Sequence, residues 1–101
     1  MASGILSGDL EQDLLLEGSS ERVYIENADR IAGDIKANLQ VGREYSLFTR
    51  YGVTEPVMNN LRALKSALHQ AFGDNGTNYH VNLNNVDGRK DRVELVIRRA
   101  H

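Results

Sequence analysis

The chain has 101 residues, with 12 lysines and arginines against 14 aspartates and glutamates, for a formal net charge of −2. This length lets one domain bury a core without cross-links, and the absence of cysteine excludes disulfides and thiolate metal sites. The slight negative charge argues against non-specific coating of nucleic acid, which needs a basic surface. Residues 1–43 carry eight acidic and four basic side chains and residues 44–101 carry six and eight, so an acidic half precedes a mildly basic one.

The first sixteen residues do not have the pattern of a secretion signal, because no basic start is followed by a long apolar stretch. No later run reaches the roughly 18 apolar residues that a membrane span requires. We therefore expect a cytoplasmic protein that has no membrane partner. Residues 1–19 are expected to form a tail or short helix, and residues 20–101 a single domain.

Three segments precede the middle of the chain. Asp9 to Leu16 is a candidate short helix ended by Gly18, and its leucines need burial either in this chain's own core or in a dimer contact. Between Ser20 and Leu39, apolar residues recur every three or four positions, which predicts a helix capped by Ser20 or Asn27. An alternative makes Arg22 to Glu26 a strand. The apolar positions are Tyr24, Ala28, Ile31, Ile35 and Leu39.

The stretch from Glu44 to Tyr51 is ambiguous, since its apolar residues alternate as in a strand and also share a helix face. Gly52 marks a tight break after it. Thr54 is a good N-cap for a long helix that ends at Gly73 and tolerates Pro56 in its first turn. Its core stripe is Val57, Leu61, Leu64, Leu68 and Ala71 or Phe72, with Asn59, Arg62, Ser66 and His69 opposite.

The C-terminal part alternates clearly. Tyr79, Val81 and Leu83 share one side of a first strand, and Val93, Leu95 and Ile97 share one side of a second. The Asp87-Gly88 pair between them is typical of a hairpin turn.

Glu44 to Ala63 resembles the helix-turn-helix pattern of DNA-binding regulators. Leu47 and Tyr51 occupy the inward positions of the first helix, Gly52 the left-handed turn and Val53 the apolar position after it. Met58 and Leu61 would anchor the second helix. Phe48 departs from the pattern, because the family usually has a small residue there. A preceding helix (Ala28 to Gln40) and a following hairpin give the element order of winged-helix domains over about 70 residues.

The resemblance implies an α+β winged helix-turn-helix with three helices and a C-terminal β-hairpin. It further implies a transcriptional regulator that binds double-stranded DNA, acting as a homodimer on half-sites about 34 Å apart. Thr54 to Gln70 would be the recognition helix in the major groove, and the hairpin tip would be the wing. The implied DNA-binding residues are Thr49, Arg50, Thr54, Asn59, Asn60, Arg62, Lys65, Arg89, Lys90 and Arg92.

For each of these side chains a plain solvent-exposed role is the competing interpretation. His69, His80 and His101 share no metal-ligand spacing, and neither a phosphate loop nor a nucleophile turn is present. We therefore expect no enzyme, no cofactor and no metal site.

The alternative hypothesis is a small α+β protein-interaction module, an adaptor or inhibitor that docks through its acidic N-terminal half and binds no nucleic acid. In that case the fold is a small antiparallel sheet with helices packed on one face. The conformation of Glu44 to Tyr51 discriminates between the two: a helix favours the regulator, and a strand paired with the hairpin favours the interaction module.

Overall fold

The computed structural model describes residues 5–16, 20–73, 78–89 and 91–101. Within these ranges the fold is α+β, with four helices and a three-stranded antiparallel sheet. The elements in chain order are α1 (Gly8–Leu16), α2 (Glu21–Glu26), α3 (Ala28–Asn38), β1 (Glu44–Arg50), α4 (Glu55–Phe72), β2 (Tyr79–Asn85), the short 3-10 helix η1 (Val86–Gly88) and β3 (Val93–Arg99).

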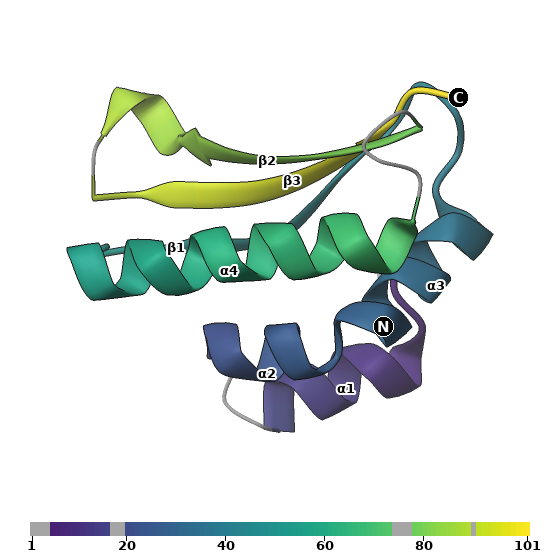
Figure 1. The fold of residues 1–101 in the computed structure, drawn as a ribbon, viewed down its shortest axis with the longest axis horizontal. Coiled ribbons are helices and arrows are strands. Elements are labelled where there is room, and N and C mark those ends of the chain that lie inside the picture. Colours follow the sequence, from purple (N-terminus) through teal and green to yellow (C-terminus); the bar gives the residue numbers. More distant parts are fainter. Residues whose placement is uncertain (1–4, 17–19, 74–77, 90) are drawn as a thin grey trace.

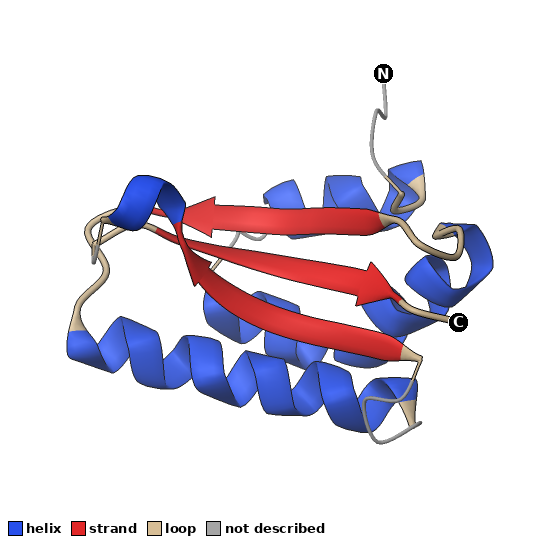
Figure 2. Ribbon diagram, turned by 90° about the horizontal axis from the view of Figure 1, so that it is seen from above, coloured by secondary structure: helices blue, strands red, loops and turns tan. Residues whose placement is uncertain are grey.

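The four α-helices lie on one side of the sheet. In Figure 1, α4 lies below β2, and α1, α2 and α3 lie below or beside α4. The sheet also contacts α2 directly, because the Tyr24 ring packs on that of Phe48 in β1. Seen from above in Figure 2, the strands lie in front of α1 to α4, so these four helices cover only one face of the sheet. The prediction of a small antiparallel sheet with helices on one face is therefore the arrangement found, whereas the winged helix-turn-helix arrangement is not confirmed.

The predicted helix from Ser20 to Leu39 is divided in two at Asn27, whose φ of −108° and ψ of 15° are not helical. Ser20 caps α2 by accepting a hydrogen bond from the Val23 amide, as predicted. Asn27 instead donates its side-chain amide to the Val23 carbonyl at 2.8 Å, which satisfies an acceptor at the break. The alternative of a strand over Arg22 to Glu26 is wrong, because the cap and the burial of Tyr24 favour the helix.

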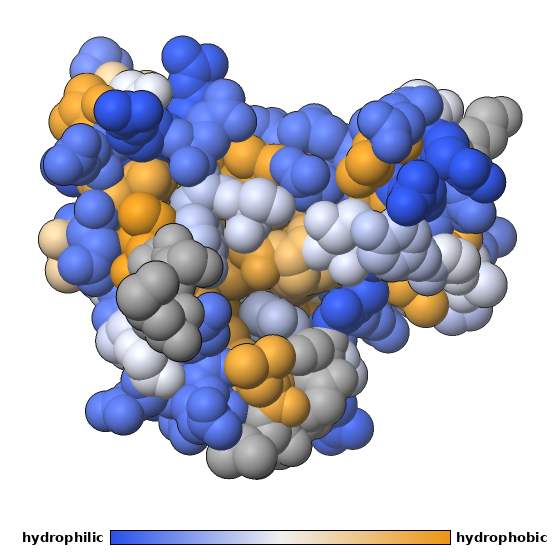
Figure 3. Space-filling view, turned by 180° about the vertical axis from the view of Figure 1, so that it is seen from behind, coloured by the Kyte–Doolittle hydropathy of each residue, from blue (hydrophilic) through white to orange (hydrophobic). Residues whose placement is uncertain are grey.

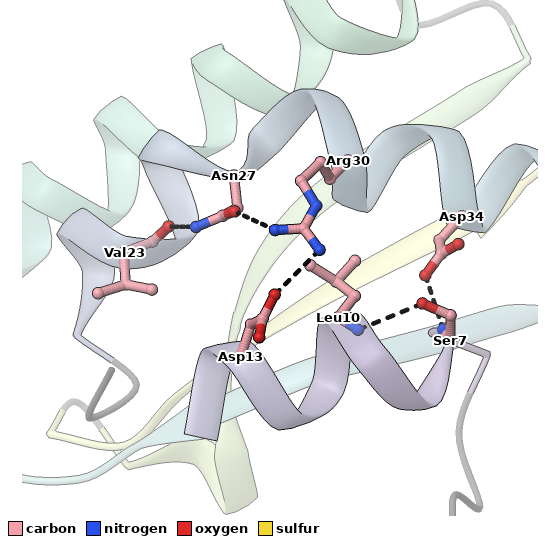
Figure 4. Close-up of polar contacts among 7 residues, drawn as sticks. All are labelled: Ser7, Leu10, Asp13, Val23, Asn27, Arg30 and Asp34. Atoms are coloured by element: carbon pink, nitrogen blue, oxygen red, sulfur yellow. Dashed lines mark hydrogen bonds and ion pairs between the residues drawn. The ribbon is translucent and has the colours of Figure 1, made fainter. Parts of the chain in front are cut away.

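The N-terminal helix α1 docks on this chain's own core. Leu6, Leu10 and Leu14 are buried in the same cluster as the residues of α3 and α4, whereas Leu15 is 63% exposed. Polar contacts with α3 flank this apolar contact (Figure 4): the Ser7 amide donates to Asp34 Oδ2 at 2.6 Å, and Arg30 Nη2 to Asp13 Oδ2 at 3.0 Å. The burial of Leu14 therefore confirms the first of the two predictions for these leucines, that they pack on this chain's own core.

The order of strands in the sheet is β1-β3-β2, so β3 is central and both neighbours are edge strands. β2 pairs with β3 over its whole length without a shift in register. β1 pairs from Glu44 opposite Arg98 to Arg50 opposite Val93, with a bulge between Ser46 and Phe48. The bulge breaks the two-residue alternation, which is why Leu47 and Phe48 both belong to the core.

The helical interpretation of Glu44 to Tyr51 is wrong, since the segment forms β1 and only then a bend at Tyr51. The reason lies in tertiary structure. A two-stranded hairpin alone has little stability, and β1 adds a third strand by hydrogen-bonding to the side of β3 that β2 leaves unpaired. Gly52 does adopt the predicted left-handed conformation, with φ of 61°. It joins a strand to a helix, however, so the first helix of the predicted helix-turn-helix is absent from this part of the described chain.

Candidate interaction surface

Helix α4 is the element that organises the surface next to the sheet. Thr54 is its N-cap and Pro56 lies in its first turn, as predicted, and Gly73 ends it with φ of 70°. Leu61, Leu64 and Leu68 are fully buried, because α4 packs against β2 on one side and against α2 and α3 on the other. The predicted core stripe is confirmed for Leu61, Leu64, Leu68 and Phe72, whereas Val57 is only half-buried.

Phe72 shows which side of α4 faces β2. Its ring stacks on that of Tyr79 at the start of β2, with centroids 4.6 Å apart and planes 3° from parallel. Residues three, four or seven positions apart lie on the same side of a helix. Met58, Arg62, Lys65 and His69 follow the same spacing from Phe72, beside the row of buried leucines, and we call these five residues the α4 stripe.

The members of the α4 stripe are exposed to different degrees. Arg62 is exposed, Met58, Lys65 and His69 are half-buried, and Phe72 is buried. Arg62 donates from Nη1 to Asn59 Oδ1 at 3.1 Å. Among the described residues, Arg62 and Lys65 take part in no ion pair, whereas Arg30, Arg50, Arg89 and Arg92 each contact a carboxylate. The stripe therefore carries positive charge that no described acid neutralises.

At every second residue of β2, the backbone N–H and C=O groups point away from β3, toward the outer edge of the sheet. The amide of Ala100 donates to the Asn78 carbonyl and that of Val86 to the Arg92 carbonyl, at either end of the β2 and β3 ladder. In an antiparallel ladder the residues bonded to the neighbouring strand alternate with those that point away. The backbone groups of Tyr79, Val81 and Leu83 therefore point away from β3.

The uncovered face of the sheet is mostly polar. The register places Ser46, Val96 and Asn82 side by side on this face, and Glu44, Arg98 and His80 in the row next to them. Asn84 of β2 and Thr49 of β1 flank Glu94 in a third row. Figure 3 looks instead at the back of the molecule, on the β1 side, where apolar residues surface in a shallow hollow bordered by hydrophilic ones.

The hairpin tip lies at the same end of the molecule as the first turn of α4 (Figure 1), and the Val53 amide donates to the Asp91 carbonyl at 3.0 Å. Asp87 and Gly88 both have positive φ, as the predicted Asp-Gly turn requires. The guanidinium of Arg92 lies 4.5 Å from the ring centroid of Tyr51, which is 63% exposed.

The charges of the tip are largely balanced. Arg92 lies 3.7 Å from Asp87, and Arg89 lies 3.5 Å from Asp91. Lys90 falls outside the described residues. The sequence predicted a basic hairpin tip. In the structure an aspartate lies beside each described arginine of the tip and offsets its positive charge.

Arg50 has an internal role. It forms an ion pair with Glu21, and its guanidinium lies 4.5 Å from the Phe48 ring centroid. Both charged side chains are mostly buried, at 22% exposed for Arg50 and 13% for Glu21. Arg50 therefore joins β1 to α2 and is separated from the exposed residues that sequence reasoning grouped with it.

The remaining predicted residues form two groups. Asn59, Asn60, Arg62 and Lys65 lie on α4, all exposed except the half-buried Lys65, while Thr54, Arg89 and Arg92 lie at the hairpin end. Thr49 lies on the uncovered sheet face opposite Glu94. Sequence reasoning missed the free edge of β2 and the aromatic surface of Tyr51. No local signal in the sequence identifies β2 as an edge strand, because the strand order is set by the pairing of β1 with β3.

A metal centre and a surface cavity are the other candidate sites. No three histidine or acidic side chains among them are placed to share a metal ion. A cavity of about 280 Å³ near the start of β1 is lined by Ile5, Leu39 and four polar or charged residues. Burial raises the pKa of the Tyr45 hydroxyl, and the nearby Glu11, Tyr24 and Asp34 raise it further.

Comparison with models of known families, with curated protein sequences and with solved structures finds no match for this chain. Across the described residues, no helix combines the length and apolar character needed to cross a bilayer.

Proposed function

We propose that this chain is a protein-interaction module that accepts an extended segment of a partner protein at the free edge of β2. The observation that carries the proposal is the composition of that edge. β2 contains no lysine, arginine, aspartate, glutamate or proline, and its pairing with β3 has no bulge. Charges, prolines and bulges are the usual protections of edge strands against pairing with another chain. β2 lacks all three, so it is suited to strand addition.

The opposite edge supports the choice of β2 by contrast. β1 contains Glu44 and Arg50 at its ends and a bulge at its centre. A bulge leaves one residue unpaired and disrupts the ladder. β1 therefore carries protections that β2 lacks. Because Tyr79 and Val81 are 7% and 1% exposed, the accessible part of the β2 edge begins at Leu83.

The proposal is tested by selecting peptides from an unbiased library and following backbone amide exchange by NMR. Bound peptides should slow exchange at Leu83 and Asn85, whose amides point away from β3 at the accessible end of β2. Leu83→Pro removes one of these amides at an edge position where proline is tolerated, and should abolish peptide binding. Leu83→Ala is the matched control, because it removes the same side-chain packing and keeps the amide. Equal binding by both variants would refute strand addition at β2.

DNA binding is the second candidate, favoured by one observation. The structure places Arg89, Arg92 and the exposed Tyr51 at the same end as Thr54, the N-cap of α4. Aromatic and arginine side chains next to a helix start suit contacts with a phosphate backbone. Under this hypothesis the protein is a transcriptional regulator, with Arg62 on the recognition helix.

Titration of labelled duplex DNA across a salt series tests this candidate. Affinity should fall steeply with salt, because each neutralised phosphate releases counterions. Arg62→Ala should cost about 1 to 3 kcal/mol of binding and relax base preference. Absence of binding at about 50 mM salt would leave only the interaction module.

A further inference from the structure

We infer that the chain binds a small organic monocarboxylate at the end of the sheet remote from the hairpin tip, with its carboxylate between Arg43 and Arg99. This site does not depend on strand addition at β2, because the accessible part of that strand lies toward the hairpin tip. The chemical class of the ligand follows from the charges at this end of the sheet and from the cavity beside them.

Arg43 and Arg99 lie side by side on neighbouring strands, and we call them the arginine pair. The Arg99 amide donates to the Arg43 carbonyl at 3.0 Å, and the Gly42 amide donates to the Arg99 carbonyl at 2.7 Å. These bonds continue the register one residue beyond Glu44, which lies opposite Arg98. Side chains directly opposite in an antiparallel pair have Cβ atoms about 5 Å apart, and like charges there are destabilising. The fold therefore places two positive charges together at a cost in stability.

No acidic side chain in the described part of the chain neutralises the arginine pair. Successive side chains of a strand point to opposite faces. Glu44 and Arg98 therefore face one another on the uncovered side of the sheet, away from the pair. The charges of Glu11 and Asp34 raise the pKa of Tyr45, two residues further along β1, but neither acid forms an ion pair with an arginine of this pair.

Arg99 is held in place by groups that leave its charge uncompensated. Its Nη1 donates to the Leu39 carbonyl at 2.6 Å, and its Nε donates to the backbone oxygen of His101 at 3.0 Å. The guanidinium carbon lies 5.6 Å from the ring centroid of Tyr79. Nη2 has no hydrogen-bond partner among the described residues. A donor that is already fixed loses little freedom when it binds an anion.

The cavity of about 280 Å³ lies beside the arginine pair. Arg43 lines it, and so does Leu39, whose carbonyl accepts the hydrogen bond from the second arginine. Ile5 and Leu39 give the cavity apolar surface, and Asn38 and Gln40 add amide groups. Its volume is close to the lower limit of about 300 Å³ for sites that bind small molecules. A ligand of a few carbon atoms with one charged end therefore fits it.

The charges around the cavity favour a carboxylate over a phosphate. Helix α3 ends at Asn38, so its carbonyl end, which carries partial negative charge, lies here. Glu44 is also part of the lining. These groups offset part of the two positive charges, so a carboxylate with one negative charge matches the site better than a phosphate monoester with nearly two. The fork of an arginine also binds both oxygens of a carboxylate.

Titration of the full chain with small molecules of one shape tests the site. The probes are isovalerate, isovaleramide, isopentylamine and isopentyl phosphate. Calorimetry measures affinity, and chemical shifts of the Gln40, Arg43 and Arg99 amides locate binding. Isovalerate should bind at least about tenfold more tightly than the amide or the amine, because hydrogen bonds between charged groups are the stronger ones.

Arg43 can be replaced without loss of the fold, since its side chain is exposed. Arg43→Gln should weaken isovalerate binding at least about tenfold, and Arg43→Lys, which keeps the charge without the fork, should weaken it less. Without ligand, Arg43→Gln should raise the midpoint of urea unfolding, because it removes the like-charge contact. Arg22→Gln, at an exposed position of α2 without a described ion pair, is the matched control and should change neither quantity.

Each outcome decides one part of the inference. Equal affinity for isovalerate and isovaleramide would overturn recognition of a carboxylate, and tighter binding of isopentyl phosphate would overturn the choice of head group. Equal binding of isovalerate by the unmodified chain and by Arg43→Gln would overturn the site itself, as would the absence of saturable binding at millimolar concentrations. None of these results bears on strand addition, whose protected amides are those of Leu83 and Asn85.

Discussion

The guanidinium of Arg50 at the end of β1 is held by the carboxylate of Glu21 in the first turn of α2, 29 residues away in sequence. The pair lies against Phe48, and the second terminal nitrogen of Arg50, Nη2, is buried without a hydrogen-bond partner. This contact joins the edge strand to the helical layer.

Removal of Glu21 alone should therefore be costly. Glu21→Ala leaves the mostly buried Arg50 charge unpaired, and we expect a loss of about 2 to 4 kcal/mol in the free energy of unfolding, measured with urea. Glu26→Ala, at an exposed position of the same helix, should change little. Replacing both partners with Glu21→Leu and Arg50→Met should recover most of the loss. A double variant as unstable as Glu21→Ala would refute this explanation.

Because of Tyr45, we expect the free energy of unfolding to fall at alkaline pH. Burial raises the pKa of its hydroxyl in the folded state, aided by Glu11, Tyr24 and Asp34. The folded chain therefore favours the neutral hydroxyl, so stability is intact below the unfolded pKa of about 10 and falls as pH rises through it. Tyr45→Phe should be less sensitive above that pH. Glu11→Gln should lower the pKa of Tyr45, measured by phenolate absorbance, and an unchanged value would exclude Glu11 as a cause.

Replacing either of two glycines with alanine should change the free energy of unfolding, but in opposite directions. Gly52 has φ of 61°, so Gly52→Ala should lower the free energy of unfolding by about 1 to 2 kcal/mol. Gly33 lies within α3, and a methyl group there meets no atom within 4 Å. Gly33→Ala should raise stability by about 0.5 to 1 kcal/mol. Thermal and urea unfolding measure both, and a neutral Gly52→Ala would mean that the corner after β1 relaxes.

The docking of α1 should depend on its apolar side and not on its ion pair. Leu10 is 2% exposed, so Leu10→Ala should cost about 2 to 4 kcal/mol. Asp13 and Arg30 are about half exposed, so Asp13→Ala should cost no more than about 0.5 kcal/mol. If the two substitutions had equal effects in urea unfolding, α1 would be held by its polar contacts.

Periodicity predicted the elements whose pattern spans several turns or a whole strand. The spacing of Leu61, Leu64 and Leu68 identified α4, and the alternation around Val81 and Leu95 identified the hairpin. Burial confirms each of these residues. Local patterns succeeded here because each element buries one continuous face.

β1 and the interaction surface depended on contacts that no local pattern encodes. The apolar residues of Glu44 to Tyr51 fit both a strand and a helix face, and the free edge of β3 decided between them. Glu21, which neutralises Arg50, is likewise remote in sequence. The relation between the α4 stripe and β2 became visible only through the stack of Phe72 on Tyr79.

The bulge at Leu47 has a consequence for assembly. Chains with two receptive sheet margins polymerise, because each copy both offers a strand and accepts one. In this molecule the edge formed by β1 has a bulge and is charged at its ends. Under the proposed function we therefore expect strand addition at β2 alone, which would give finite one-to-one complexes and no fibres.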